Sequence, residues 1–234
     1  MANPLTEVLK RENQNLKDAG LFKFELPLES PQKPIIHAGD RELINLASSN
    51  YLGFANDPSI KKAAKLALDR FGVGLSAPRT HTGSQTQHRE LEQKLADFSG
   101  AEDAMLFASG YHANTGIFEP LFGNRDFIFL DARAHPSLAD GIRLAGAKVR
   151  PYRHLDLEDL EDRLKRSRAA RFRVIVTDGV YPIDGTLAPL DGICHLATRY
   201  DAMVIVSDAQ GIGVLGERGR GVGEHFRVAP QLTL

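Results

Sequence analysis

Short polar side chains follow several of the most apolar stretches of this sequence. They stand at or near the carboxyl ends of four apolar runs, and they are Ser109, Asp131, Asp178 and Asp208. In an open parallel sheet the carboxyl ends of the strands lie along one edge, which is where ligands bind. Four such side chains on one edge therefore predict a ligand site.

The segment SGYHANTG at 109–116 has the composition of a phosphate cradle. Ser109 and Gly110 follow an apolar run, and a helix can begin near Tyr111. Backbone N–H groups at a helix start, a serine hydroxyl and a permissive glycine together bind phosphate well. A plain helix cap with a tight turn explains the same residues, so this motif alone leaves both interpretations open.

His135 lies shortly after Asp131, past a predicted strand end, where its ring can project toward the same edge. As a single feature, a hydrogen-bonded loop histidine is the simpler interpretation. A phosphate cradle, a ring and the isolated carboxylate of Asp208 together suggest pyridoxal phosphate. That cofactor needs phosphate donors, a stacking partner and an acid that faces its pyridine nitrogen.

Other kinds of site are disfavoured by the residue patterns. The glycines at 211, 213 and 216 have the G-x-G-x-x-G spacing of a dinucleotide site. However, the segment that follows them is a poor helix, and no later strand or well-placed acid is evident. The histidines show no metal-ligand spacing, and no G-x-S-x-G nucleophile motif is present.

The elements that must position these residues alternate between apolar and amphipathic segments. The expected helices cover 1–20, 58–71, 88–98, 157–166 and 191–200. The expected strands cover 104–109, 127–132, 148–152, 174–179 and 203–209. Most of the strands are continuously apolar, as in a parallel sheet that is covered on both faces. This alternation predicts an α/β fold with a mostly parallel sheet flanked by helices.

Composition narrows the class of protein further. The chain has 234 residues, 42% of them hydrophobic, and a formal net charge of -1. That charge gives no reason to expect nucleic-acid or anionic-membrane partners. Cys194 is the single cysteine, so no internal disulfide can form, and a cytoplasmic location fits best. The N-terminal stretch lacks the apolar core of a signal peptide, and no run is long enough to span a membrane.

Five segments of the sequence resemble the α-oxoamine synthases. They are NLASSNYLGFANDP (45–58), the long block from GVGLSAPRTHTGS to SGYHAN (72–114), DARAHPSLADGIRLAGA (131–147), TDGVYPIDGTLAPL (177–190) and SDAQGIGVLGERGRG (207–221). The likeness is strongest to the glycine C-acetyltransferase (2-amino-3-ketobutyrate CoA ligase) branch. It implies a fold-type-I pyridoxal-phosphate transferase: an N-terminal helix and arm over 1–45, and an incomplete large domain over 46–234.

The resemblance also implies roles for particular residues. Ser109, Gly110 and Tyr111 would hold the phosphate, and His135 would stack on the pyridine ring. Three further roles complete the site: Asp208 would pair with the pyridinium nitrogen, Gln210 would bond the 3′-oxygen, and Asn50 would bind the substrate carboxylate. As in the family, the chain would act as a homodimer.

The sequence also departs from the family pattern. Gln210 stands where the family has a histidine, and it cannot carry a proton; Pro182 stands where the family has a serine. The printed sequence ends at Leu234, before the segment that carries the family's Schiff-base lysine. A strand at 104–109 would then lose its neighbours.

Two functions remain open from the sequence. The first is condensation of a small amino acid, glycine being the favoured one, with an acyl-CoA such as acetyl-CoA to give a 2-amino-3-oxo acid. This chain is expected to be inactive on its own. The alternative is a lysine-less partner subunit, paired with a full-length family member, or a relic.

Overall fold

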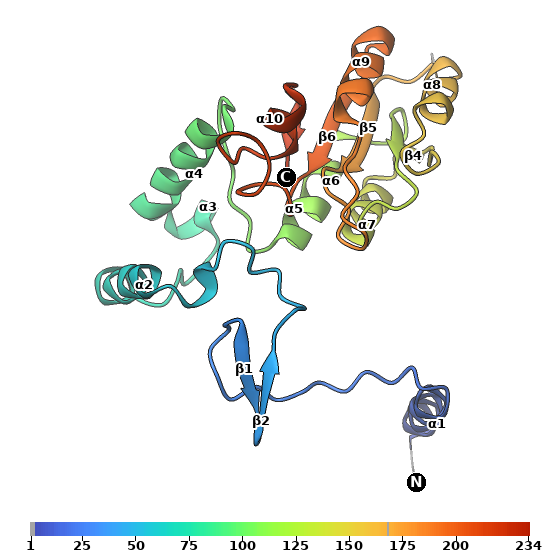
Figure 1. Cartoon of the computed structure of the whole chain (residues 1–234). Helices are drawn as coiled ribbons and strands as arrows, with labels where there is room; N and C mark the ends of the chain where they lie inside the picture. Colours follow the sequence, from blue (N-terminus) through green and yellow to red (C-terminus); the bar gives the residue numbers. More distant parts are fainter. Residues whose placement is uncertain (1–2, 168) are drawn as a thin grey trace. The chain divides into compact units, whose positions relative to one another are not determined.

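The computed structural model describes residues 3–167 and 169–234. The chain forms two compact units, the first ending at Gly74 and the second covering Leu75–Leu234 (Figure 1). The boundary between arm and large domain near residue 45 stays a prediction. No helix among the described residues is long and apolar enough to cross a membrane.

The first unit contains two helices, a short helical turn and one hairpin. Its elements are α1 (Pro4–Asp18), β1 (Ile35–Ala38), β2 (Arg41–Ile44), η1 (Phe54–Asn56) and α2 (Pro58–Phe71). Both predicted helices are confirmed, and each has a proline in its first turn. The Asn3 and Asp57 side chains cap α1 and α2 by accepting backbone N–H groups, as N-cap residues do.

The second unit is built on a five-stranded parallel sheet of order β4-β3-β5-β6-β7. Its strands are β3 (Phe127–Leu130), β4 (Lys148–Val149), β5 (Arg173–Asp178), β6 (Met203–Ser207) and β7 (Leu232–Thr233). Four of the five predicted strands are therefore confirmed, although β4 is shorter than expected. The predicted α/β class with a parallel sheet is also confirmed.

Helices cover both faces of this sheet (Figure 1). The described helices of the second unit are α3 (Arg79–Thr82), α4 (Thr86–Ser99), α5 (Gly110–Gly116), α6 (Phe118–Leu121), α7 (Pro136–Ala145), α8 (Leu157–Lys165), α9 (Leu190–Tyr200) and α10 (Val222–Phe226), of which α6 to α10 pack onto the sheet. One face packs against Phe118 of α6 and Leu138 and Ile142 of α7, and we call it the α7 face. The other packs against α8, α9 and α10, and we call it the α9 face.

The predicted strand at 104–109 is wrong, because this segment has no regular structure. A strand needs a neighbour for its N–H and C=O groups, and no described strand pairs with this one. Met105 is instead 73% exposed, and the N–H of Leu106 donates to Oε1 of Glu92 at 3.2 Å. The segment is thus tied to α4 rather than to the sheet.

The prediction that no strand follows residue 209 is also wrong. β7 lies parallel to β6, and the N–H of Asp208 donates to the carbonyl of Leu234 at 2.8 Å. The glycine loop between them still differs from a dinucleotide motif, since Gly213 and Gly216 adopt left-handed backbone conformations and α10 begins only at Val222. Both elements are short, which explains why their apolar pattern gives little signal.

We predict that Gly141→Ala destabilises the protein by about 1–3 kcal/mol. A methyl group at this position in α7 would lie less than 3.0 Å from the carbonyl oxygen of Asn114 and from the Phe118 ring. Gly123→Ala is the matched control, because a Cβ there meets nothing within 4 Å. Urea unfolding measures both variants, and equal midpoints would contradict the close approach of α5 to α7.

Candidate functional site

Three of the predicted strand-end acids lie at the carboxyl edge of the sheet. Asp131 follows β3, Asp178 ends β5 and Asp208 follows β6. All three are buried, with exposed fractions between 1% and 5%. Ser109 does not follow a strand, but it begins α5. The sequence-predicted edge therefore exists, with three acids at strand ends rather than four polar termini.

The proposed phosphate cradle is the start of α5. Oγ of Ser109 accepts the N–H of His112 at 3.1 Å, so this hydroxyl caps the helix. Within the described part of the chain, the N–H groups of Gly110 and Tyr111 form no hydrogen bond. A Cβ added at Gly110 would meet nothing within 4 Å. The helix start thus has two N–H donors without a partner among the described residues.

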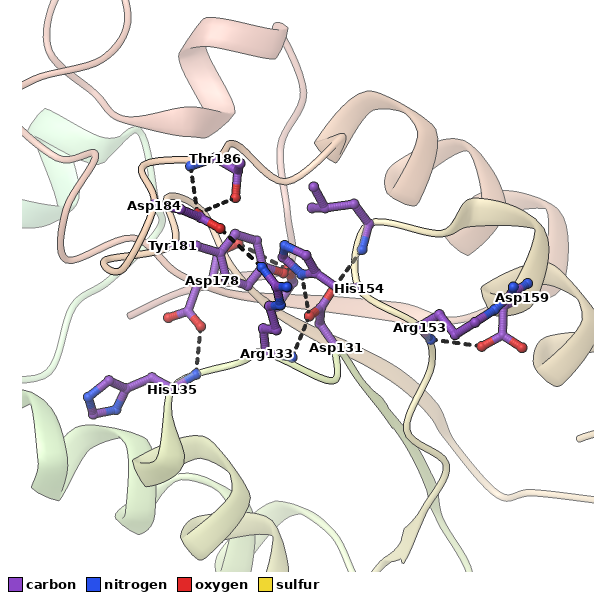
Figure 2. Close-up of polar contacts among 12 residues, drawn as sticks. Asp131, Arg133, His135, Arg153, His154, Asp159, Asp178, Tyr181, Asp184 and Thr186 are labelled. Atoms are coloured by element: carbon purple, nitrogen blue, oxygen red, sulfur yellow. Dashed lines mark hydrogen bonds and ion pairs between the residues drawn. The ribbon is translucent and has the colours of Figure 1, made fainter. Parts of the chain in front are cut away.

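His135 is the N-cap of α7 and lies on the α7 face. Its N–H donates to Oδ2 of Asp178 at 2.7 Å (Figure 2). Its Nδ1 lies 2.6 Å from Oγ of Ser137, which also accepts Nδ2 of Asn114 at 2.8 Å. The ring is exposed. A continuous chain of hydrogen bonds therefore links the ring to α5, which begins with the cradle.

Asp178 holds the backbone of the loop that carries His135. Burial raises the pKa of this carboxyl, and the N–H of His135 opposes that rise. Hydrogen bonds to a carboxylate favour its charged form, whereas loss of water disfavours it. The same contact that orients the loop also supports the charge of Asp178.

Asp131 holds the other end of this loop, on the α9 face. Its carboxylate accepts the N–H of Arg133 at 2.8 Å and that of Leu155 at 3.0 Å. Nδ1 of His154 lies 2.9 Å from Oδ1 of the same carboxylate (Figure 2). The His154 ring meets the Tyr181 ring edge-on, with centroids 4.5 Å apart. Sequence reasoning gave no role to His154 or Tyr181, although Tyr181 lies in the family-like segment at 177–190.

We predict that Asp131→Ala lowers the free energy of unfolding by about 2–4 kcal/mol, because it leaves buried donors without an acceptor. Asp162→Ala is the control, since the Asp162 side chain is 59% exposed and its one ion-pair partner among the described residues is Lys165. An exposed pair of that kind contributes up to about 1 kcal/mol. Urea denaturation compares the two variants, and similar losses would argue against Asp131 as the loop anchor.

Asp208 does not lie on the face that carries His135. Its Oδ2 accepts the N–H of Val222 at 2.7 Å, and Val222 belongs to the core of the α9 face. Its Oδ1 is buried and has no hydrogen-bond partner among the described residues. The role expected for Asp208, pairing with a pyridinium nitrogen, stays a prediction.

Burial raises the pKa of Asp208 to about 6, and the N–H groups of Val222 and Gly211 oppose the shift. The folded protein then binds more protons than the unfolded chain between about pH 4 and pH 6. Stability from this group therefore falls as the pH rises through that window.

We predict that Asp208→Asn removes this pH dependence. Between pH 4 and pH 6 the variant should gain up to about 3 kcal/mol relative to the wild type. The amide oxygen of asparagine can still accept the N–H of Val222. Asp201→Asn is the control, because the Asp201 side chain is fully exposed. Parallel stability profiles for wild type and Asp208→Asn would contradict the shift.

The two remaining predicted residues have separate surroundings. Oε1 of Gln210 is buried without a hydrogen-bond partner among the described residues. Asn50 lies in the first unit, where its Oδ1 accepts the N–H of Ala55 at 3.1 Å in a local turn. The role expected for Asn50 stays a prediction.

Known proteins are similar to this chain in sequence and in fold. The family described as "Aminotransferase class I and II" matches residues 41–232. The 8-amino-7-oxononanoate synthase of Fervidobacterium nodosum is 46% identical over 224 residues, and the 2-amino-3-ketobutyrate coenzyme A ligase of Escherichia coli K12 is 43% identical over 237 residues. These matches cover 94% and 100% of this chain.

The chain belongs to the class I and II aminotransferases and, within them, to the α-oxoamine synthases. It spans 57% and 60% of the length of these two relatives. The solved structure of a serine palmitoyltransferase from S. paucimobilis with bound PLP and myriocin has a TM-score of 0.88 and is 36% identical. That match covers 96% of this chain and 57% of the solved one.

The likeness to individual members does not single out one α-oxoamine synthase. The relatives named after the synthase and those named after the ligase lie at similar identity. The expected closeness to the ligase branch therefore stays a prediction.

Proposed function

We propose that the protein to which this chain belongs is a pyridoxal-phosphate-dependent acyltransferase that condenses a small amino acid with an acyl-CoA. Glycine and acetyl-CoA are the first pair to test. The observation that carries the proposal is the link between the free N–H groups of α5 and the exposed ring of His135. Asn114 and Ser137 connect the two through hydrogen bonds on one face of the sheet.

The residues of the α7 face fit the cofactor. The N–H groups of Gly110 and Tyr111 would bind the phosphate, since they form no hydrogen bond within the described residues. The His135 ring would stack on the pyridine ring, held by Ser137 and by the contact of its N–H with Asp178. The chemistry that the cofactor supplies when bound is the acceptance of electrons from the substrate α-carbon.

The residues of this chain would then position the cofactor and keep water away from it. α5 fixes the phosphate end, while Asp178 and Asp131 fix the two ends of the loop 131–135. Gln210 can donate a hydrogen bond to an oxygen on the ring but cannot transfer a proton. Asn50 remains the candidate for the substrate carboxylate. We also propose a cytoplasmic homodimer, by likeness to the family.

A second candidate function is a non-catalytic subunit that pairs with an active family member. Gln210 and Pro182 favour it, because they replace a proton-transferring ring and a hydroxyl in the family pattern.

The test uses the full-length protein with pyridoxal phosphate, glycine and acetyl-CoA. Absorbance titration measures cofactor binding, and a thiol reagent measures CoA release. His135→Ala should weaken cofactor binding by about tenfold through lost stacking, while His195→Ala on α9 should not. CoA release supports the acyltransferase, and cofactor binding without CoA release supports the partner subunit. Absence of cofactor binding would reject both.

A further inference from the structure

We propose that the amino edge of the sheet carries a second binding site, which takes a small phosphate-bearing anion. The site is a hollow between the loop that leads into β3 and the residues just before β5. It lies at the opposite ends of the strands from the three strand-end acids. None of its residues takes part in the proposed function, so the two proposals can fail separately.

The size of the hollow limits what it can hold. Its volume is about 250 Å³, and it is lined by residues 120–126, from the end of α6 to the start of β3, and by Arg171. Pockets for drug-sized ligands measure roughly 300–1,000 Å³. The hollow therefore admits one small group, such as a phosphate, rather than a nucleotide.

Asp126 holds the walls of the hollow together. Its carboxylate is fully buried, and it accepts the N–H of Gly123 at 2.8 Å and that of Phe172 at 3.1 Å. The Arg171 guanidinium donates to both of its oxygens, from Nε at 2.8 Å and from Nη2 at 2.5 Å. A bidentate pair of this kind balances the charge of the carboxylate. Asp126 therefore does not repel an anion as an unpaired carboxylate would.

Arg171 is fixed in place with part of its guanidinium unused. The guanidinium carbon lies 4.6 Å from the centroid of the Phe172 ring, while Nε and Nη2 bind Asp126. Nη1 forms no hydrogen bond within the described residues. Because the planar group is already held by a carboxylate and a ring, little conformational entropy is lost when Nη1 binds a ligand.

Arg125 supplies the positive charge that nothing balances. Its carbonyl accepts the N–H of Arg171 at 2.9 Å, so the two arginines are neighbours. The Arg125 side chain is exposed and has no carboxylate partner in the described part of the chain. Two arginines and the carboxylate of Asp126 line the hollow, which leaves one net positive charge.

The free polar groups of the hollow favour a phosphate over other ligands. Hydrogen-bond donors predominate: the Arg125 guanidinium, Nη1 of Arg171, and the backbone N–H groups of Asn124 and Arg125, which are unbonded within the described residues. The exposed Asn124 amide adds another donor. A cation would find no unpaired carboxylate on this lining. A phosphate group offers more acceptor oxygens than a carboxylate, and arginine with backbone N–H groups suits it.

The test is a titration of the full-length protein with inorganic phosphate at constant ionic strength, followed by amide NMR. The signals of Asn124 and Arg125 report on the hollow, whereas those of Gly110 and Tyr111 report on the start of α5. Phosphate should shift the first pair saturably, and Arg125→Gln should weaken this affinity by about tenfold. Arg166→Gln is the matched control, because Arg166 is exposed at the end of α8, on the other face of the sheet. It should leave the affinity unchanged.

Glycerol phosphate serves as a second probe. Tighter binding of the ester indicates a phosphorylated metabolite as the ligand, tighter binding of inorganic phosphate indicates the free ion, and both support the site. The proposal is overturned if the Asn124 and Arg125 signals do not respond, if Arg125→Gln and Arg166→Gln lose affinity equally, or if acetate binds as tightly as phosphate. If Arg125→Gln fails to fold, Asn124→Ala takes its place, since that side chain is exposed.

Discussion

Side chains alternate between the two faces of the parallel sheet, and this alternation determines how the second unit is packed. Because β3, β5 and β6 are buried on both faces, successive residues of each strand face opposite helical layers. The same rule that separates Ile175 from Val176 in the core also separates Asp178 from Gly179 at the edge. Position in the sheet, rather than proximity in sequence, decides which polar groups can act together.

The three acids at the strand ends share one physical role. Each carboxylate accepts backbone N–H groups from a loop: Asp131 from the segment at 133 and from Leu155, Asp178 from His135, and Asp208 from Val222. A buried carboxylate that loses water needs such donors to stay charged. The loops therefore supply N–H donors to the buried carboxylates, and the carboxylates in turn hold the loops at the edge of the sheet.

The sequence predicts most of the helices and strands, but it does not predict which strands and which side chains pair with one another. Local periodicity is enough to find α1, α2, α8, α9 and most of the sheet, because each element carries its own pattern. The segment at 104–109 has an equally apolar pattern, but a strand also needs a neighbour, which local residues cannot reveal. The pairing of Asp131 with His154 spans 23 positions in the chain, and no spacing rule connects them.

For a related reason, the sequence does not predict on which face of the sheet Asp208 lies. A half-buried strand shows alternating polar and apolar residues, which mark its two faces. β6 is apolar at every position before Ser207, so nothing in MVIVS distinguishes one face from the other. Only the packing of Val204 and Ile205 against different helices resolves it.

The close contact of three glycines with Asp208 leads us to expect that positions 179, 208, 211 and 221 change together in evolution. A Cβ at 179, 211 or 221 would lie less than 3.0 Å from a carboxylate oxygen of Asp208, so a side chain at any of these positions requires the group at 208 to shift or to become smaller. Changes at these positions should therefore be inherited jointly among descendants of this sequence. Of the three glycines with dinucleotide-like spacing, Gly211 lies against the buried carboxylate of Asp208, whereas Gly216 lies against Glu224.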